Sequence, residues 1–252
     1  MNSTLDHLRV VLVSTRNPLN IGAAARAMSN FGARQLRLVN PYDAAFREAR
    51  SAVGASDLLK NAKVYKSVAE AVADCRVVVG TTAAGRRELQ HELRRLDAGA
   101  RVIRKQLASA PVALLFGSEK VGLSNDDMSH CHWLMRIPAR EEHGSMNLGQ
   151  AVAVCLYELV RSGKTAVAEK GARRAAAGDV ERFTQLLFDV LGASGYVKPR
   201  VAAATREKLR RMIRRMNLND ADAELWLGML RQIAWKVVAA GPSQNNPRNN
   251  NN

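Results

Sequence analysis

The sequence contains few cysteines and no apolar run long enough to cross a membrane. Its three cysteines are an odd number and lie far apart, which argues against a disulfide framework and favours a reducing compartment. A membrane helix needs about 18 consecutive apolar residues, and no stretch approaches that length. The first residues also lack the basic segment and apolar segment of a secretory signal. We therefore expect a cytoplasmic protein with no membrane partner.

Common motifs for nucleotides, metals and covalent catalysis are missing as well. No G-x-x-x-x-G-K-[S/T] is present, and neither G-x-G-x-x-G nor an acidic glycine-rich loop follows the first predicted strand. His130, Cys131 and His132 have no second ligand pair at zinc-site spacing, so we predict no metal and a partly buried cysteine beside surface histidines. Neither Ser145 nor Cys155 belongs to a visible nucleophile–base arrangement.

Acidic residues are scarce relative to basic ones. The chain has 38 Lys and Arg against 23 Asp and Glu, a net charge of +15. Residues 161–252 hold 17 basic and 8 acidic side chains, so more than half of the excess lies in the last third. Such an excess attracts a polyanion and indicates a nucleic-acid partner. A soluble protein with a merely basic surface is the alternative.

The apolar pattern predicts strands that alternate with helices. Continuous apolar runs, typical of strands buried on both faces of a sheet, occur at 8–13, 36–41, 76–80, 111–117 and 132–138, with a further strand near Val64. Helical patterns include the alanine-rich segment 23–31 and a long helix over 146–160. This alternation predicts an α/β domain with a mainly parallel sheet over residues 1–162.

The remainder of the sequence predicts a small all-α extension. Residues 163–179 resemble a linker, three amphipathic patterns span 180–240, and the Asn-rich residues 241–252 predict a disordered tail. The second helix has an apolar stripe at Leu209, Met212, Ile213 and Met216. Its arginines predict a face that contacts RNA phosphates, with a solvated charged face as the alternative: Arg210, Arg211, Arg214 and Arg215.

Three polar loops follow predicted parallel strands. They cover residues 80–83, 117–123 and 137–148. Loops at the carboxyl ends of parallel strands commonly hold small ligands, and these could bind a purine through backbone amides between Leu, Met and Ile side chains. For any single loop, glycines that only form a tight turn are the alternative.

Three segments resemble the motifs of the SpoU/TrmH branch of SPOUT RNA methyltransferases. They are NPLNIGAAARAM from Asn17, GSEKVGLS from Gly117, and IP from Ile137 followed by SMNLGQAV from Ser145. The segments AVGASD at 52–57 and GTTA at 80–83, with the helical extension, are similar to the TrmJ group of tRNA 2′-O-ribose methyltransferases. The resemblance spans residues 8 to 240.

The resemblance implies properties that the pattern alone does not give. SPOUT domains carry a C-terminal trefoil knot in the sheet, form homodimers and bind S-adenosylmethionine in the knot. The cofactor contacts carried over by motif are Thr81, Thr82, Ala83, Gly117, Ile137, Ser145, Met146 and Asn147. Arg86 and Arg87 are expected to contact RNA.

The same motifs place Arg26, Asn20 and Glu119 at the reacting ribose. Methyl transfer to a 2′-hydroxyl requires alignment of oxygen, methyl carbon and sulfur, and stabilisation of the charge that grows on the oxygen. A free guanidinium has a pKa above about 12, so we expect Arg26 to act electrostatically and not as a general base. Glu119 is expected to orient Asn20 or a loop amide, or else to cap the following helix.

The resemblance therefore implies S-adenosylmethionine-dependent 2′-O-methylation of tRNA, at the pyrimidine at position 32 of the anticodon loop. Two alternatives remain at this point. One is a ribosomal RNA methyltransferase of the same family, and the other is a non-catalytic RNA-binding module that retains the fold.

Overall fold

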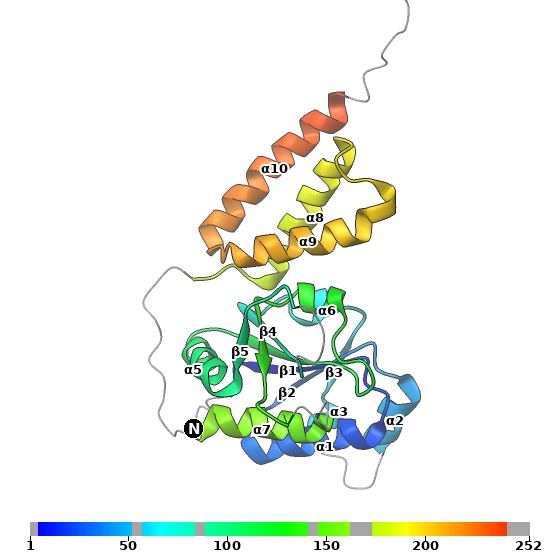
Figure 1. Cartoon of the computed structure of the whole chain (residues 1–252), viewed down its shortest axis with the longest axis vertical. Helices are drawn as coiled ribbons and strands as arrows, with labels where there is room; N and C mark the ends of the chain where they lie inside the picture. The colour runs from blue at the N-terminus through cyan, green and yellow to red at the C-terminus, as the bar shows by residue number, and fades with distance from the viewer. Residues whose placement is uncertain (1–4, 52–56, 84–88, 141–145, 162–172, 241–252) are drawn as a thin grey trace, which may run out of the picture.

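The computed structural model describes residues 5–51, 57–83, 89–140, 146–161 and 173–240 (Figure 1). Several predicted features lie outside these ranges: Ser145, Arg86, Arg87, most of the segment 52–57 and the tail 241–252. Within the described ranges, no helix is both long and apolar enough to cross a membrane.

Seven parallel strands form one sheet in the described part of the chain, in the order β3-β2-β1-β6-β4-β7-β5. Their bounds are β1 (Leu8–Val13), β2 (Gln35–Val39), β3 (Lys63–Tyr65), β4 (Val77–Thr81), β5 (Leu93–Arg95), β6 (Val112–Phe116) and β7 (Trp133–Arg136). The α/β fold with a parallel sheet is confirmed. The trefoil knot stays a prediction.

Helices cover both faces of the sheet because its central strands are apolar on both sides. In β1, Val10 and Leu12 belong to the core beneath α1, α5 and α7, whereas Val11 and Val13 belong to the core beneath α4 and α6. The helices of the first face are α1 (Pro18–Phe31), α2 (Asp43–Ser51), α3 (Asp57–Lys60), α5 (Leu96–Leu107) and α7 (Leu148–Val160). On the second face lie α4 (Val68–Ala71) and α6 (Asn125–Ser129).

Helices α1 and α7 lie side by side, and their sequences explain how they begin and how closely they pack. Asn17 caps α1 by accepting a hydrogen bond from the Leu19 amide, and Pro18 occupies the first turn. Asn147 caps α7 in the same way. A Cβ on Gly149 would lie 2.5 Å from the Cβ of Ala23, so only glycine allows this close approach.

The helical extension stands next to α6 and consists of three helices and a short 3-10 turn (Figure 1). They are α8 (Ala177–Ala193), the turn Pro199–Val201, α9 (Ala202–Arg215) and α10 (Asp220–Ala240). Val180, Phe183, Ile213, Leu227 and Leu230 form its small core. Helix α8 begins three residues before the predicted helical segment, and Ala177 already packs into the second core of the sheet.

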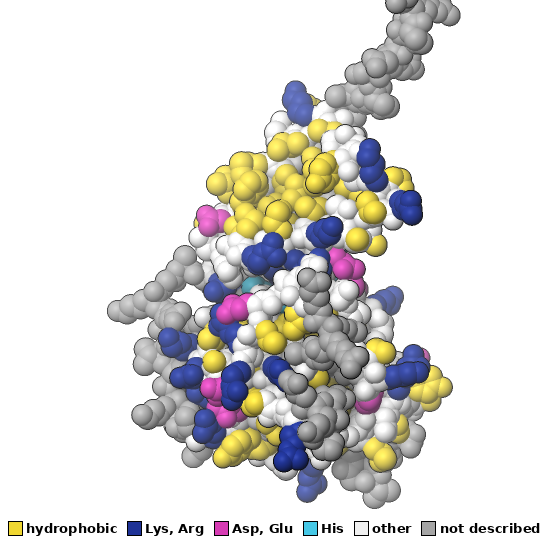
Figure 2. Space-filling model, in the orientation of Figure 1, with side chains coloured by type: hydrophobic (Ala, Val, Ile, Leu, Met, Phe, Trp, Pro, Cys, Tyr) yellow, Lys and Arg dark blue, Asp and Glu magenta, His cyan; other side chains and the backbone are white. Residues whose placement is uncertain are grey.

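The predicted apolar stripe of α9 is only partly correct. Ile213 is buried, but Met212 and Met216 are each 42% exposed. Other apolar side chains of the extension are also exposed, and Figure 2 shows them gathered over this part of the molecule. On α10 they include Leu225, Met229, Ile233 and Trp235. Part of the apolar surface of the extension is therefore exposed to solvent.

Candidate active site

The sheet order brings the predicted ligand loops to one edge. Strands β1, β6, β4 and β7 are neighbours, so their carboxyl ends lie together. The loops that follow them begin at Ser14, Gly117, Thr82 and Ile137. This is the edge where open parallel sheets bind ligands.

A chain of side-chain hydrogen bonds joins three of these segments. The amide nitrogen Nδ2 of Asn20, in α1, donates to Glu119 Oε1 at 2.9 Å. Asn147, at the start of α7, donates from its own Nδ2 to Asn20 Oδ1 at 2.9 Å. Glu119 also accepts hydrogen bonds from the backbone amides of Arg16 and Asn17, both at 3.4 Å. Residues that are 127 positions apart in the sequence are thus held together.

Glu119 determines which group donates and which accepts in each of these hydrogen bonds. An ionised carboxylate only accepts hydrogen bonds, so Asn20 must present its NH2 group to Glu119 and its oxygen to Asn147. The oxygen of Asn147 then accepts from the Gly149 and Gln150 amides at the start of α7. Of the expectations for Glu119, its contact with Asn20 and the loop amides is present, whereas the following helix α6 is capped by Ser124.

The loop that carries Glu119 is closely folded. Ser118 and Gly122 form a short antiparallel bridge, and Gly122 has φ +69°, in the left-handed region that favours glycine. A Cβ on Gly117 would lie 2.0 Å from the carbonyl carbon of Gly122. Both glycines are therefore required by the conformation of the loop.

The residues expected to bind the cofactor lie at the same edge, apart from Ser145, which is outside the described ranges. Thr81 and Thr82 follow β4 and make internal bonds: the Thr81 hydroxyl donates to Leu115 O at 2.8 Å, and the Thr82 amide donates to Met135 O at 3.0 Å. Ala83 is exposed, and Ile137 and Met146 are half-buried. The threonines thus connect β4 to its neighbours, and Ile137 and Met146 offer apolar surface.

An open hollow of about 340 Å³ lies beside Glu119. It is lined by the start of α1 and by the motif loop: Arg16, Asn17, Pro18, Asn20, Ser118, Glu119 and Lys120. Arg16 and Lys120 place two cationic side chains at its rim, next to the polar Asn20 and Glu119. Its volume and charge suit a sugar–phosphate unit.

Comparison with known proteins identifies the family of the chain. A sequence model of the SpoU rRNA Methylase family matches residues 7–157. The chain belongs to this family. A protein named tRNA (cytidine/uridine-2′-O-)-methyltransferase TrmJ from Sodalis glossinidius is 37% identical over 235 residues, with 91% of this chain and 92% of the relative covered. The protein of that name from Klebsiella pneumoniae is 36% identical over 237 residues, covering 91% and 97%.

Solved structures show the same likeness. The crystal structure of TrmJ from Z. mobilis ZM4 has a TM-score of 0.77 and 31% identity, and covers 89% of this chain and 98% of that one. A probable methylase family protein from Haemophilus influenzae Rd KW20 has a TM-score of 0.54 and 30% identity, covering 94% and 99%. Both coverages include the helical extension, which lies beyond the residues matched by the SpoU family model.

Arg26, which we expected at the reacting ribose, lies apart from Asn20. In an α-helix, residues six positions apart point roughly 120° away from each other and are separated by about 9 Å along the axis. Asn20 is buried and bonded to Glu119, whereas Arg26 is exposed. Arg26 instead shares the outer face of α1 with Leu19, seven residues earlier, which is 78% exposed.

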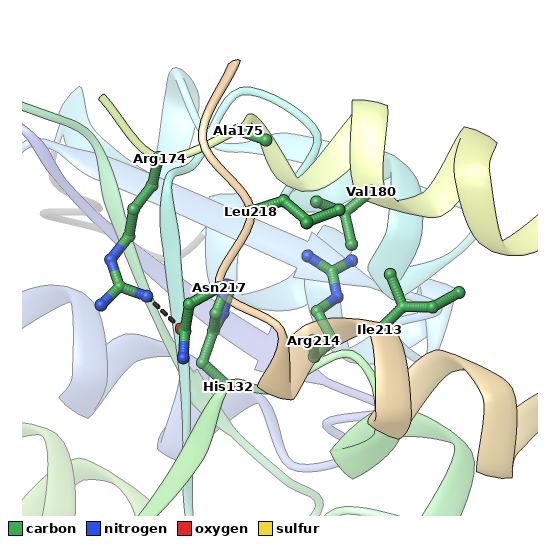
Figure 3. Close-up of a pocket in the computed structure, with 8 residues that line it drawn as sticks. All are labelled: His132, Arg174, Ala175, Val180, Ile213, Arg214, Asn217 and Leu218. Atoms are coloured by element: carbon green, nitrogen blue, oxygen red, sulfur yellow. Dashed lines mark hydrogen bonds between the residues drawn. The ribbon is translucent and has the colours of Figure 1, made fainter. Parts of the chain in front are cut away.

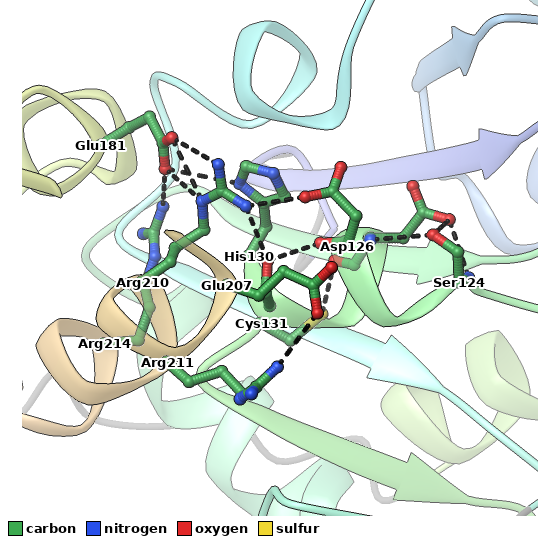
Figure 4. Close-up of polar contacts among 11 residues, drawn as sticks. Ser124, Asp126, His130, Cys131, Glu181, Glu207, Arg210, Arg211 and Arg214 are labelled. Carbon is green, nitrogen blue, oxygen red and sulfur yellow. Dashed lines mark hydrogen bonds and ion pairs between the residues drawn. The ribbon is translucent and has the colours of Figure 1, made fainter. Parts of the chain in front are cut away.

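Three arginines that we expected to contact RNA are buried, which corrects the prediction of a basic surface on α9. Arg210, Arg211 and Arg214 are 5%, 8% and 2% exposed, and only Arg215 is exposed to solvent. Figure 4 shows these arginines directed at acidic side chains where the extension meets the SpoU domain, the part of the chain that the family model matches (residues 7–157). Arg210 pairs with Glu181 and Asp126, and Arg211 with Glu207. Charged side chains are buried when they are paired in this way.

The histidines beside Cys131 are also placed differently from the prediction. His130 is buried, not at the surface, and burial together with Arg210 and Arg214 lowers its pKa well below the usual value. His132 accepts a hydrogen bond from the Val78 amide at 3.1 Å. Burial raises the pKa of Cys131 to about 12. Among the described residues there is no group of three or more His, Cys, Asp or Glu side chains that could hold a metal.

A second cavity lies at the junction between the SpoU domain and the extension. Figure 3 shows Arg214, Val180 and His132 around it. Its volume of about 10 Å³ has room for roughly one water molecule, which excludes a cofactor. The hollow beside Glu119 is therefore the better candidate for the site of reaction.

Proposed function

We propose that this chain is an S-adenosylmethionine-dependent methyltransferase that methylates the ribose 2′-hydroxyl of tRNA, at the pyrimidine at position 32 of the anticodon loop. The observation that carries the proposal is the hydrogen-bonded chain of Glu119, Asn20 and Asn147 beside an open hollow. The names of the relatives support tRNA as the substrate, and their likeness extends through the helical extension. The cytoplasm, where tRNA is available, is the proposed location.

The residues at the sheet edge fit the methyl donor. Ile137 and Met146 provide half-buried apolar surface suited to an adenine ring, and the Glu119 carboxylate places negative charge where a sulfonium would be attracted. S-adenosylmethionine supplies an activated methyl group on a good leaving group. The protein must then orient the ribose hydroxyl and stabilise its developing charge.

Each polar group has a distinct part in this proposal. Asn20 is held by Glu119 on one side and by Asn147 on the other, so its amide is fixed before substrate binds. Arg16 and Lys120, at the rim of the hollow, would bind the phosphates that flank the target ribose. We retain the proposal that other arginines contact RNA or stabilise the charge that develops on the ribose oxygen: Arg26, Arg215, Arg86 and Arg87. For Arg210, Arg211 and Arg214, burial argues against a direct RNA contact.

We propose further that the active form is a homodimer, in which Arg26 serves the site of its partner. Arg26 lies on the exposed face of α1, away from Asn20, and Leu19 on this face is 78% exposed. Tyr157 of the adjacent α7 is 56% exposed and meets Phe31 edge-on at 6.4 Å between ring centroids. An exposed apolar face beside a catalytic arginine suits a symmetric dimer contact.

Subunit mixing tests this dimer. Co-expression of Arg26→Ala and Glu119→Gln chains yields half heterodimers, each with one intact composite site if Arg26 acts across the interface. The mixture would then show about a quarter of the wild-type activity, whereas each variant alone would retain about a tenth or less. If the mixture is as inactive as the single variants, Arg26 acts within its own protomer or has no part in the reaction.

The enzymatic proposal is tested by mass spectrometry of nucleosides from tRNA treated with the protein and S-adenosylmethionine. We expect a 2′-O-methylated pyrimidine, and we expect Arg26→Lys to bind the cofactor normally in calorimetry but to lose most turnover. Ribosomal RNA methylated in preference to tRNA would favour the alternative substrate. If calorimetric titration detects no binding of either S-adenosylmethionine or its demethylated product, a non-catalytic RNA-binding module would be indicated.

A further inference from the structure

One buried guanidinium, that of Arg210, lies at the junction between the helical extension and the SpoU domain. The junction also contains backbone hydrogen bonds from Ala177 and Gly178 to Cys75 and Ala73, and an ion pair between Arg76 and Asp220. The Nε and Nη2 of Arg210 donate to the carboxylate of Glu181 on α8, with the shortest distances at 2.9 Å. Its Nη1 donates to Asp126 Oδ1 at 2.9 Å and to Ser129 Oγ at 2.8 Å, both on α6 (Figure 4). Arg210 itself lies on α9, so a single side chain links three helices.

Helix α6 is the direct continuation of the loop that carries Glu119. The loop from Gly117 ends at Ser124, and α6 begins at the next residue. Ser124 and Asp127 form reciprocal capping hydrogen bonds, which fix the first turn of α6. Leu123 is buried, and the bridge of Ser118 to Gly122 closes the loop. Because these contacts constrain the loop up to the first turn of α6, a displacement of α6 moves the loop as well.

The chemistry of the contact favours a role in geometry over one in stability alone. A buried ion pair adds little net stability compared with apolar packing, because both charges lose their hydration. It does impose direction, since a planar guanidinium satisfies its donors only when Glu181, Asp126 and Ser129 are correctly placed. Met128 and Ser129 of α6 are buried, whereas the side chain of Asp126 is 66% exposed and pairs with Arg210 at 2.9 Å, so this pair fixes the exposed side of α6.

We propose that Arg210 is a positioning residue for methyl transfer: by holding α6 against the extension, it keeps the loop Gly117–Ser124 in the conformation in which Glu119 meets Asn20. This inference rests on the proposed methyltransferase function. Arg210 touches neither substrate nor cofactor and acts only through α6. The extension thereby supports the catalytic loop in addition to any contact that it makes with RNA.

The test compares Arg210→Met and Asp126→Asn in the full chain with Arg182→Ala as a control. Arg182 is the neighbour of Glu181 in α8, but its side chain is 66% exposed and pairs at the surface with Asp179. At saturating S-adenosylmethionine we expect kcat on tRNA to fall about tenfold in Arg210→Met and less in Asp126→Asn, with the KM for tRNA little changed. Amide hydrogen exchange in residues 117–124 should be faster in both variants and unchanged in the control. Arg210→Lys should recover part of kcat, because it keeps one cationic donor.

Each outcome decides the matter. An unchanged kcat with unchanged exchange in residues 117–124 would overturn the proposal, and so would a rise in the KM for tRNA alone, which would make Arg210 an RNA-binding residue. If Arg210→Met fails to fold, Asp126→Asn decides, because it alters only the partly exposed α6 end of the contact. If the wild-type protein methylates no RNA, the proposed function fails, while the exchange measurement still reports whether Arg210 controls the loop.

Discussion

Replacement of Glu119 by glutamine tests the hydrogen-bonded chain at the candidate active site with a change of only one atom. The carboxylate accepts from Asn20 and from the amides of Arg16 and Asn17, and glutamine has one accepting oxygen and one NH2 group. If the glutamine oxygen takes the place of Oε1, it still accepts from Asn20 and Asn17, but its NH2 group faces the backbone N–H of Arg16. If the glutamine amide is reversed, its NH2 group faces Asn20, whose own amide must then flip to offer its oxygen. The flipped NH2 group of Asn20 then faces the NH2 group of Asn147.

In either arrangement, one charge-assisted hydrogen bond is lost and two hydrogen-bond donors face each other. Such a bond contributes about 1.5–3 kcal/mol, which corresponds to a loss of about 10- to 150-fold in kcat if the geometry matters mainly in the transition state. The assay is transfer of labelled methyl from S-adenosylmethionine to a tRNA transcript, with kcat and KM determined separately. Glu70→Gln is the control, because Glu70 also accepts a backbone amide, at 3.1 Å from Lys66 N, but lies at the start of α4. A kcat for Glu119→Gln within twofold of wild type would refute the reasoning.

Three further predictions concern stability and reactivity. Gly117→Ala places a Cβ 2.0 Å from the carbonyl carbon of Gly122. The free energy of unfolding measured in urea should therefore fall by about 2–4 kcal/mol, and calorimetry should show weaker binding of the cofactor. Burial, followed by the charges of Arg210 and Arg214, lowers the pKa of His130 in the folded protein. Below the ordinary pKa of 6.5 the unfolded chain therefore takes up a proton at His130 and the folded chain does not, which favours unfolding. The urea concentration at the midpoint of unfolding should decrease when the pH is lowered from 7 to 5.5. Burial raises the pKa of Cys155 to about 12, so a thiol reagent should modify it slowly in the native protein and rapidly in denaturant, and fast native reaction would contradict its burial.

The central strands could be predicted from sequence because they are buried on both faces. The run Leu8–Val13 matches β1 in both bounds, and the predicted strand at 111–117 exceeds β6 (Val112–Phe116) by one residue at each end. Strand β5 (Leu93–Arg95) was missed because it is a short edge strand with two arginines and an exposed leucine, which leaves no apolar run to detect. The extension was predicted as helical, but its first residues were assigned to a linker because small residues such as Ala177 carry little apolar signal.

The candidate site depended more on resemblance than on pattern. Periodicity places polar loops at one sheet edge, but it cannot show that Asn147 bonds to Asn20 across 127 positions. The motifs identified these residues, and the structure shows how they are connected. The basic face of α9 was misjudged for a related reason: Arg210 finds its partner Glu181 on another helix, and no local pattern reveals such a pair.

The buried junction also determines how the extension can be studied. Ala177, at the start of α8, packs with Val72, Met128 and Cys131 in the second core of the sheet, and Arg210 holds α6 from α9. Removal of the extension would therefore uncover part of the second core and remove the contact between Arg210 and α6, besides removing any RNA contact. A loss of tRNA methylation after truncation would not separate these effects. Substitutions at the junction and at exposed cations such as Arg215 do separate them, because the first alter the contact of α9 with α6 and the second alter the attraction for phosphate.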